Sequence, residues 1–105
     1  MDVSASRVNG QYLPAYSGNR VCIIGKVLSQ NGNVATIQSS DNHQIAINRN
    51  PGANYGSQFV EVVGMVNGQS IQEERACDFG DNFDLETYDA LVHMMNGKFK
   101  NMFSD

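Results

Sequence analysis

The chain has 105 residues, a length that predicts one domain with one modest hydrophobic core. Its net charge of −4 argues against a dedicated nucleic-acid-binding protein, because such proteins carry a basic surface for phosphates. The sequence has neither an apolar run long enough to span a membrane nor a charged-then-apolar leader. We therefore expect a soluble protein that is not exported and has no membrane partner.

The first 20 residues are predicted to form an extension ahead of the main folded unit. Residues 1–7 are small and polar, and we expect them to fray. Tyr12, Leu13 and Tyr16 then surround a proline, a pattern that predicts either a short helical turn or an extended cover.

Five β-strands are predicted between residues 21 and 79, because β-branched and other apolar residues gather in short runs separated by turn signals. The dipeptide Asn-Gly occurs at 31–32 and at 67–68, and it is a strong short-range signal for a hairpin. Ile45 and Ile47 alternate with polar neighbours, as in a half-buried strand. The predicted strands span residues 21–28, 33–39, 44–48, 59–66 and 70–78.

Glycines lie inside two of these strands, at Gly25 and Gly64. Glycine weakens a strand unless the sheet bends or bulges there, and small closed barrels need such bends. A bulge in an open sheet is the alternative. The longest connection, residues 49–58, falls between the third and fourth strands, as it does in the five-stranded OB-fold barrel. We therefore predict an all-β OB-fold barrel over residues 21–79, followed by one C-terminal helix.

Motifs for catalysis or cofactor binding are absent from the sequence. It contains no nucleophile elbow, no glycine loop for phosphate and no cluster with metal-ligand spacing. Cys22 and Cys77 are expected to be free thiols rather than a disulfide, since no export signal precedes them. His43 and His93 lack zinc-ligand spacing with these cysteines. We therefore expect a protein that is not an enzyme and that uses no cofactor or metal.

Acidic residues concentrate at the C-terminal end of the predicted barrel. Seven of the eleven carboxylates lie within residues 73–89. They form either a solvated surface beside a helix N-terminus, where negative charge suits the helix dipole, or a surface that repels nucleic acid. The seven are Glu73, Glu74, Asp78, Asp81, Asp84, Glu86 and Asp89.

Nucleic-acid binding by an OB barrel uses a groove over its second and third strands, where bases stack on aromatic rings. The corresponding segments here, residues 33–39 and 44–48, contain no aromatic residue. Each stacked base contributes about 1–3 kcal/mol in such grooves, so binding by this chain alone is expected to be weak. The nearby cations are Lys26 and Arg49, which are either weak candidates for phosphate binding or ordinary surface charges.

An amphipathic helix is predicted over residues 84–103, with Asp84 or its neighbour as the N-cap. A helix that ended at Gly97 would leave residues 99–103 as a separate tail. The apolar stripe of the helix packs either on the chain's own barrel or on another protein, if the N-terminal aromatic residues close the barrel base instead. The stripe consists of Leu85, Tyr88, Leu91, Val92, Met95 and, if the helix continues, Phe99.

Four segments, in their order and spacing, resemble the smallest subunit of replication protein A, the eukaryotic heterotrimer that binds single-stranded DNA. They read Arg-Val-Asn-Gly at 7–10, Val-Cys-Ile-Ile-Gly-Lys-Val at 21–27, Phe-Val-Glu-Val-Val-Gly-Met-Val at 59–66 and Asn-Phe-Asp-Leu-Glu-Thr-Tyr at 82–88. The similarity extends from about residue 7 to residue 103, nearly the whole chain.

This resemblance implies a structural subunit, in the nucleus, of a complex that serves DNA replication, repair and recombination. It implies an OB fold whose C-terminal helix bundles with helices of the middle and large subunits, with single-stranded DNA bound mainly through the complex. Carried over by position, the bundle contacts would be Leu85, Tyr88, Leu91, Val92, Met95 and Phe99. Two alternatives remain: an independent nucleic-acid-binding OB module, and the small OB subunit of a telomere-capping trimer.

Overall fold

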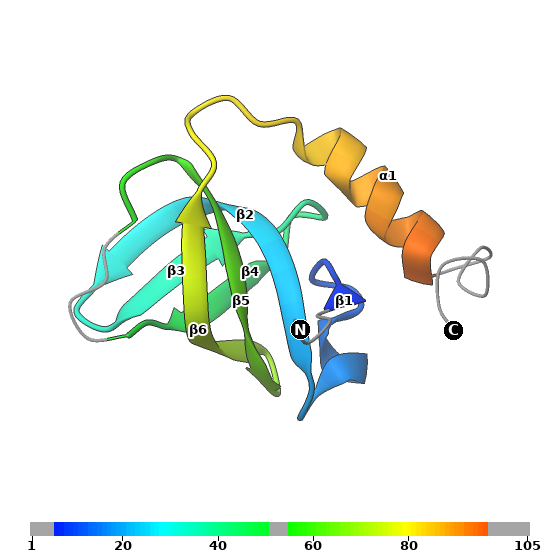
Figure 1. Cartoon of the computed structure of the whole chain (residues 1–105), viewed down its shortest axis with the longest axis horizontal. Helices are drawn as coiled ribbons and strands as arrows, with labels where there is room; N and C mark the ends of the chain where they lie inside the picture. The colour runs from blue at the N-terminus through cyan, green and yellow to red at the C-terminus, as the bar shows by residue number, and fades with distance from the viewer. Residues whose placement is uncertain (1–5, 51–54, 97–105) are drawn as a thin grey trace, which may run out of the picture.

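The computed structural model describes residues 6–50 and 55–96, which form a closed β-barrel with one helix lying beside it (Figure 1). Within these ranges no helix has both the length and the apolar character required to cross a lipid bilayer. The elements in chain order are β1 (Ser6–Arg7), the 3-10 helix η1 (Leu13–Tyr16), β2 (Arg20–Asn31), β3 (Val34–Gln38), β4 (Gln44–Asn48), β5 (Phe59–Asn67), β6 (Ser70–Asp78) and α1 (Leu85–Asn96).

Strands β2 to β6 close into a five-stranded barrel, which confirms the predicted fold class. The twelve-residue strand β2 pairs with β5 through its first half and with β3 through its second half, both antiparallel. A short parallel pairing of β4 with β6, which includes Ile47 and Ile71, completes the ring. β2 extends beyond the predicted residues 21–28, because an irregularity between Val27 and Ser29 lets it continue from one half of the barrel into the other.

Two segments outside the strands contribute side chains to the barrel core. Leu13 of η1 is 2% exposed, and Tyr12 and Tyr16 pack partly against the same core, so this N-terminal turn helps to cover the barrel. Tyr55, 7% exposed, enters the core from the loop before β5. Tyr55 was not predicted, since one aromatic residue in a loop rich in Asn and Gly produces no periodic pattern.

The expectation that residues 1–7 fray is wrong for the part of that segment that the structure describes. Ser6 and Arg7 form the short strand β1, which pairs in parallel with Val21 and Cys22 of β2. The next residue, Val8, is fully buried, and its N–H donates to the Cys22 carbonyl at 3.1 Å. Two polar residues give no strand signal of their own, and the pairing depends on the burial of Val8 behind them. Residues 1–5 lie outside the described residues.

The two strand glycines lie where neighbouring strands approach closely. An added Cβ at Gly64 would overlap the backbone carbonyl of Gln72 and lie 2.8 Å from Ile71 Cγ2. At Gly25 it would lie 2.8 Å from the carbonyl oxygen of Gln38. The pairing of β5 with β6 also shifts register directly before Gly64. The prediction that these glycines mark bends of a closed barrel agrees with this geometry.

Replacement of Gly64 by alanine is expected to lower the free energy of unfolding by about 3 kcal/mol, the upper end for overpacked sites, because the new methyl group meets backbone atoms. Gly32→Ala is the control, since that position has open space and only a positive φ of 60° disfavours alanine. We expect it to cost about 1 kcal/mol. Urea-induced unfolding followed by circular dichroism measures both. Equal losses would contradict the close-approach explanation.

Candidate subunit interface

Helix α1 begins at a side-chain cap. The Asp84 carboxylate accepts a hydrogen bond from the Thr87 backbone N–H at 3.2 Å and another from the Thr87 hydroxyl at 2.6 Å. These bonds hold the pKa of Asp84 below its ordinary value. The predicted cap at Asp84 is therefore confirmed. The helix is described as far as Asn96, so the question of an end at Gly97 falls outside the described residues.

The inner face of the helix packs on the chain's own barrel. Tyr88 is 4% exposed and Val92 is fully buried, and both belong to one buried apolar cluster with Ile24 of β2. The Tyr88 hydroxyl lies 3.1 Å from the Val8 carbonyl oxygen and 3.3 Å from that of Cys22, and it donates to these acceptors. Burial raises the pKa of Tyr88, so the hydroxyl keeps its proton.

Polar contacts join the helix to the N-terminal segment, which we define as residues 8–12. Asp89 Oδ1 accepts hydrogen bonds from Asn9 Nδ2 at 2.8 Å and from the Ser40 hydroxyl at 2.7 Å. Asp89 Oδ2 lies 3.2 Å from His93 Nε2, and His93 Nδ1 lies 3.0 Å from the Tyr12 hydroxyl. Asn9 is fully buried by this arrangement.

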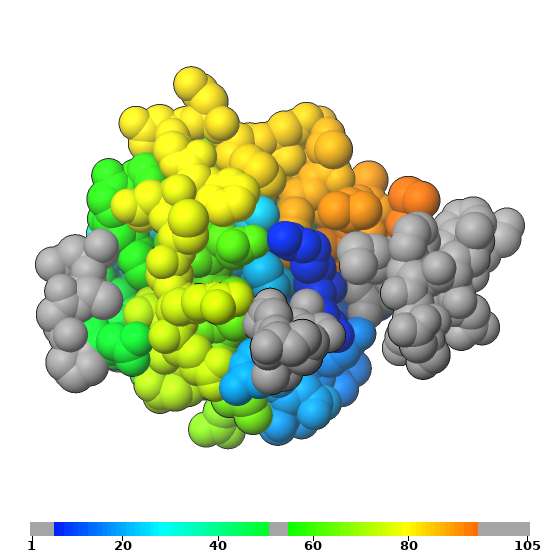
Figure 2. All heavy atoms as spheres, viewed as in Figure 1, coloured from blue at the N-terminus to red at the C-terminus, as the bar shows by residue number. Residues whose placement is uncertain are grey.

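The other side of the N-terminal segment is held by the turn between β3 and β4. The Asp41 carboxylate accepts the backbone N–H groups of Gly10 at 2.9 Å and Gln11 at 2.8 Å. A side chain at position 10 would overlap His43, so glycine is required there. Figure 2 shows the N-terminal segment, in dark blue, between the barrel strands and the orange helix. The helix therefore rests partly on this segment rather than only on the strands.

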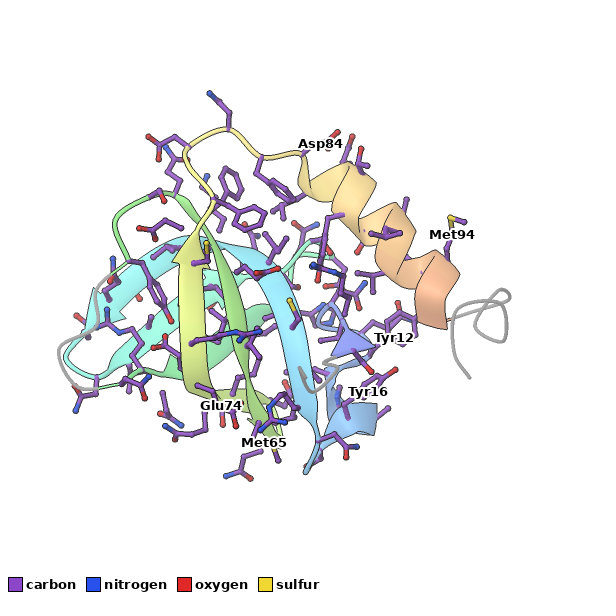
Figure 3. All side chains as sticks on the ribbon, in the orientation of Figure 1. Tyr12, Tyr16, Met65, Glu74, Asp84 and Met94 are labelled. Atoms are coloured by element: carbon purple, nitrogen blue, oxygen red, sulfur yellow. The ribbon has the colours of Figure 1, made fainter. Side chains whose placement is uncertain are left out.

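The opposite side of the helix is uncharged and exposed. Its outer face, which we define as Thr87, Ala90, Leu91 and Met94, is classed as exposed throughout. Leu91 is 42% exposed and Met94 is 44% exposed, and Figure 3 shows Met94 pointing away from the barrel. These two residues are large apolar side chains that the barrel leaves uncovered.

The structure thus divides the predicted stripe. Tyr88 and Val92 face the barrel, Leu85 packs partly on the same cluster, and Leu91 faces outward. The side chain of Met95 and all of Phe99 lie outside the described residues. Met94 is the outward residue that the predicted stripe omitted, and the pair of adjacent methionines was the signal for it.

The outer surface of β3 and β4, the usual nucleic-acid face of an OB barrel, carries no aromatic side chain. Lys26 is exposed at its edge, directly opposite Gln38 of β3 and Phe59 of β5. This surface offers a cation and hydrogen-bonding groups, without a ring on which a base can stack. Its outward residues are Val34, Thr36, Gln38, Gln44, Ala46 and Asn48.

Arg49 is not on that surface, which contradicts its selection as a candidate for phosphate binding. It is only 4% exposed, and its guanidinium donates to the Gln30 side chain at 2.5 Å and to the Gly32 carbonyl. The same group lies 5.5 Å from the centre of the Tyr55 ring. Its charge is therefore used to fasten the loop before β5 to the end of β2.

Most of the acidic segment is exposed, as predicted for a solvated surface, but Glu73 is buried and Asp89 is half-buried. Glu73 is only 4% exposed, and its carboxylate accepts a hydrogen bond from the Tyr55 hydroxyl. Burial and this bond both raise the pKa of Tyr55. Glu74 accepts two bonds from the Arg20 guanidinium, at 2.6 and 3.1 Å. These carboxylates, like Asp89, connect segments of this chain.

Both cysteines are free thiols. Cys22 is buried and donates to the Glu61 carboxylate at 3.2 Å, while Cys77 is exposed. Burial, with this bond, raises the pKa of Cys22 to about 12, so it is not a reactive thiolate. Among residues 6–50 and 55–96, no group of three or more His, Cys, Asp and Glu side chains is arranged to hold a metal ion.

A comparison with protein families matches residues 1–103 to the family described as Replication factor A protein 3. The chain belongs to this family. It is similar to the replication protein A 14 kDa subunit of Oryza sativa subsp. japonica, with 36% identity covering 98% of this chain and 99% of that protein.

Among solved structures, the chain is similar to one in the structure of U. maydis replication protein A bound to ssDNA. The TM-score is 0.91 and the identity 33%, and the match covers 100% of both chains. The telomere capping protein Ten1 from Saccharomyces pombe gives a TM-score of 0.68 at 13% identity, covering 85% of this chain and 94% of that one. The latter likeness shows a shared fold and no more.

Acid is expected to loosen the N-terminal segment through Asp41. Burial alone would raise the pKa of Asp41, but hydrogen bonds from Ser39, Gln11 and Gly10, together with His43, outweigh it and hold the pKa below its ordinary value. A carboxyl whose pKa is lowered by folding stabilises the fold fully above its unfolded pKa, about 3.9, and loses this effect as the pH falls through the folded pKa.

The acid-induced loss of stability should therefore be smaller in Asp41→Asn than in the natural chain. Unfolding free energies measured at about pH 6 and about pH 3 test this, since that window brackets the unfolded pKa. Glu86→Gln, at an exposed position of the helix, is the control and should behave like the natural chain. An identical loss in the Asp41→Asn chain would contradict the assignment.

Proposed function

We propose that this chain is a non-catalytic small subunit of a replication protein A complex, and that it joins the larger subunits through the outer face of helix α1. The observation that carries this proposal is the pair Leu91 and Met94, two large apolar side chains exposed on an uncharged helix surface. Membership of the Replication factor A protein 3 family supports the same reading.

The described side chains support a bundle of helices as the partner structure. The inner face of α1 is occupied by the chain's own barrel through Tyr88 and Val92, so the outer face is the side that the described residues leave available. Apolar residues spaced three positions apart, as Leu91 and Met94 are, form a ridge that packs into the groove of a neighbouring helix. We propose that Met95 and Phe99 extend this contact.

The second part of the proposal concerns DNA. A related chain belongs to a replication protein A structure bound to ssDNA, and we propose that this protein acts on single-stranded DNA, in the nucleus, mainly as part of such a complex. The nucleic-acid face of its own barrel has no stacking platform, and Arg49 is buried. Lys26 remains as a minor contact to the phosphates of the DNA. No described feature favours a telomere-capping complex.

Introducing charge on the outer face should prevent assembly. The double substitution Leu91→Asp and Met94→Asp is expected to abolish co-purification with the middle and large subunits, because both carboxylates would be buried without a partner. The barrel should keep its thermal unfolding temperature, since both side chains are exposed in the isolated chain.

A matched control exists on the barrel. Leu28→Asp with Val34→Asp makes the same chemical change at exposed apolar residues, 44% and 42% exposed, on β2 and β3. We expect this variant to co-purify normally. Assembly retained by the helix variant, or lost equally by both variants, would contradict the proposed interface.

The isolated chain should bind single-stranded DNA weakly. Fluorescence anisotropy with a labelled oligonucleotide is expected to give a dissociation constant no tighter than about 10⁻⁶ M at physiological salt, the range of non-specific binding. Lys26→Ala should reduce the salt dependence of the binding constant by at most the contribution of about one phosphate contact. Tighter binding by the isolated chain would instead favour an independent nucleic-acid-binding module.

A further inference from the structure

The apolar stripe of α1 is wider than the barrel surface beneath it. Val92 is fully buried against the barrel, while Leu91, about 100° away around the helix axis, is 42% exposed. A rotation of the helix about its own axis would bury Leu91 at the expense of Val92. Hydrophobic burial is non-directional, so it does not by itself determine which of these side chains faces outward.

Directional contacts lie on the inner face, where the Tyr88 hydroxyl donates to the Val8 and Cys22 carbonyls, and also on one flank beside it. Asp89 and His93 are one helical turn apart, on the flank opposite Leu91. Asp89 accepts hydrogen bonds from Asn9 and Ser40 at 2.8 and 2.7 Å. These donors belong to segments about 50 and 80 residues away in the sequence, and they constrain the flank from outside the helix.

His93 adds a second constraint on the same flank. Its Nε2 lies 3.2 Å from Asp89 Oδ2, and its Nδ1 lies 3.0 Å from the Tyr12 hydroxyl. A neutral ring with its proton on Nε2 satisfies both partners, since it donates to the carboxylate and accepts from the hydroxyl. The ring planes of Tyr12 and His93 also meet edge to face, with centroids 5.5 Å apart.

We propose that Asp89 and His93 are positioning residues that fix the rotation of α1 about its own axis. By holding one flank on the N-terminal segment, they leave Leu91 and Met94 outward, where a partner can reach them. Without them the helix rotates toward burial of Leu91 and masks its own assembly surface. This inference rests on the proposed function for its biological meaning, but the rotation itself is measurable on the isolated chain.

Thiol labelling measures the direction in which each helix position points. In a Cys77→Ser background, which removes the exposed native thiol, Leu91→Cys and Val92→Cys are made separately, since Cys22 is buried. With the hydrogen bonds of Asp89 and His93 intact, the thiol at position 91 should react at least about tenfold faster than the thiol at position 92, which reacts only after local opening.

The double substitution Asp89→Ala with His93→Ala is then added to each chain. We expect labelling at position 91 to slow and labelling at position 92 to accelerate, so that the ratio of the two rates falls at least about threefold while circular dichroism still reports the helix. Unchanged rates would overturn the proposal. Acceleration at both positions would also overturn it, because it would mean that the hydrogen bonds of Asp89 and His93 dock the helix without setting its rotation.

Two further variants separate positioning from general stability. Asp89→Asn, made in place of the double substitution, keeps the oxygen that accepts from Asn9 and Ser40. The ratio of the labelling rates at positions 91 and 92 should then equal that of the chain with Asp89 and His93. Glu86→Ala removes an exposed carboxylate from the same helix and should leave the ratio unchanged. A ratio that Asp89→Asn fails to restore, or that Glu86→Ala reduces equally, would overturn the specific role of Asp89.

The consequence for assembly is tested with the co-expressed complex. The Asp89→Ala, His93→Ala chain should be recovered with its partner subunits at a yield reduced at least about fivefold, and Asp89→Asn should restore it. Unreduced recovery would overturn the link between rotation and assembly. If the charged variant at Leu91 and Met94 still assembles, the proposed interface fails, whereas the labelling result stands on its own.

Discussion

The attachment of the helix to the barrel depends on the N-terminal segment, residues 8–12. This segment lies between the two, and its backbone and side chains supply groups that both of them bind. The Val8 carbonyl accepts from Tyr88 of the helix, while Gly10 donates to Asp41 of the barrel turn. Because Val8 and Asn9 are fully buried, the segment is part of the fold and not a loose extension.

This arrangement gives each side of the helix a different function. The inner face supplies burial and the hydrogen bonds of the Tyr88 hydroxyl. The flank supplies hydrogen bonds to a carboxylate, which are stronger and more directional than contacts between apolar groups. Among residues 6–50 and 55–96, the outer face leaves Leu91 and Met94 exposed. Leu91 and Met94 form an exposed apolar ridge, and its contact with water is unfavourable. Packing against a partner helix would remove this contact with water.

The barrel shows a similar use of charge for internal structure. Arg49 and Glu73 are each 4% exposed, and both bind groups of the loop before β5 or of neighbouring strand ends. A barrel of this size has little apolar core to spare, so polar contacts help to hold its ends closed. These charges are consequently unavailable to phosphates, which agrees with the proposed role in assembly.

Much of the fold followed from local patterns in the sequence. The bounds of β4 and β6 were predicted to the residue. The alternation of Ile45 and Ile47 indicated β4, whereas β6 was indicated by the Asn-Gly turn before it and by Gly80 and Asp81 after it. The helix N-cap at Asp84 was also predicted from the sequence, because capping depends on residues three positions apart. The pairing of β1 was not predicted, since two polar residues next to a single valine show no alternation of apolar and polar residues.

The sequence by itself determined the barrel, the helix, the width of its apolar stripe and the lack of stacking rings on the binding strands. Only the tertiary structure decided which part of the stripe is left for a partner, and that Arg49 is buried. The physical reason is the distance along the sequence between the residues in contact. Periodicity reports contacts within a turn or a hairpin, whereas the outward position of Leu91 depends on a bond between Asn9 and Asp89, which lie 80 residues apart.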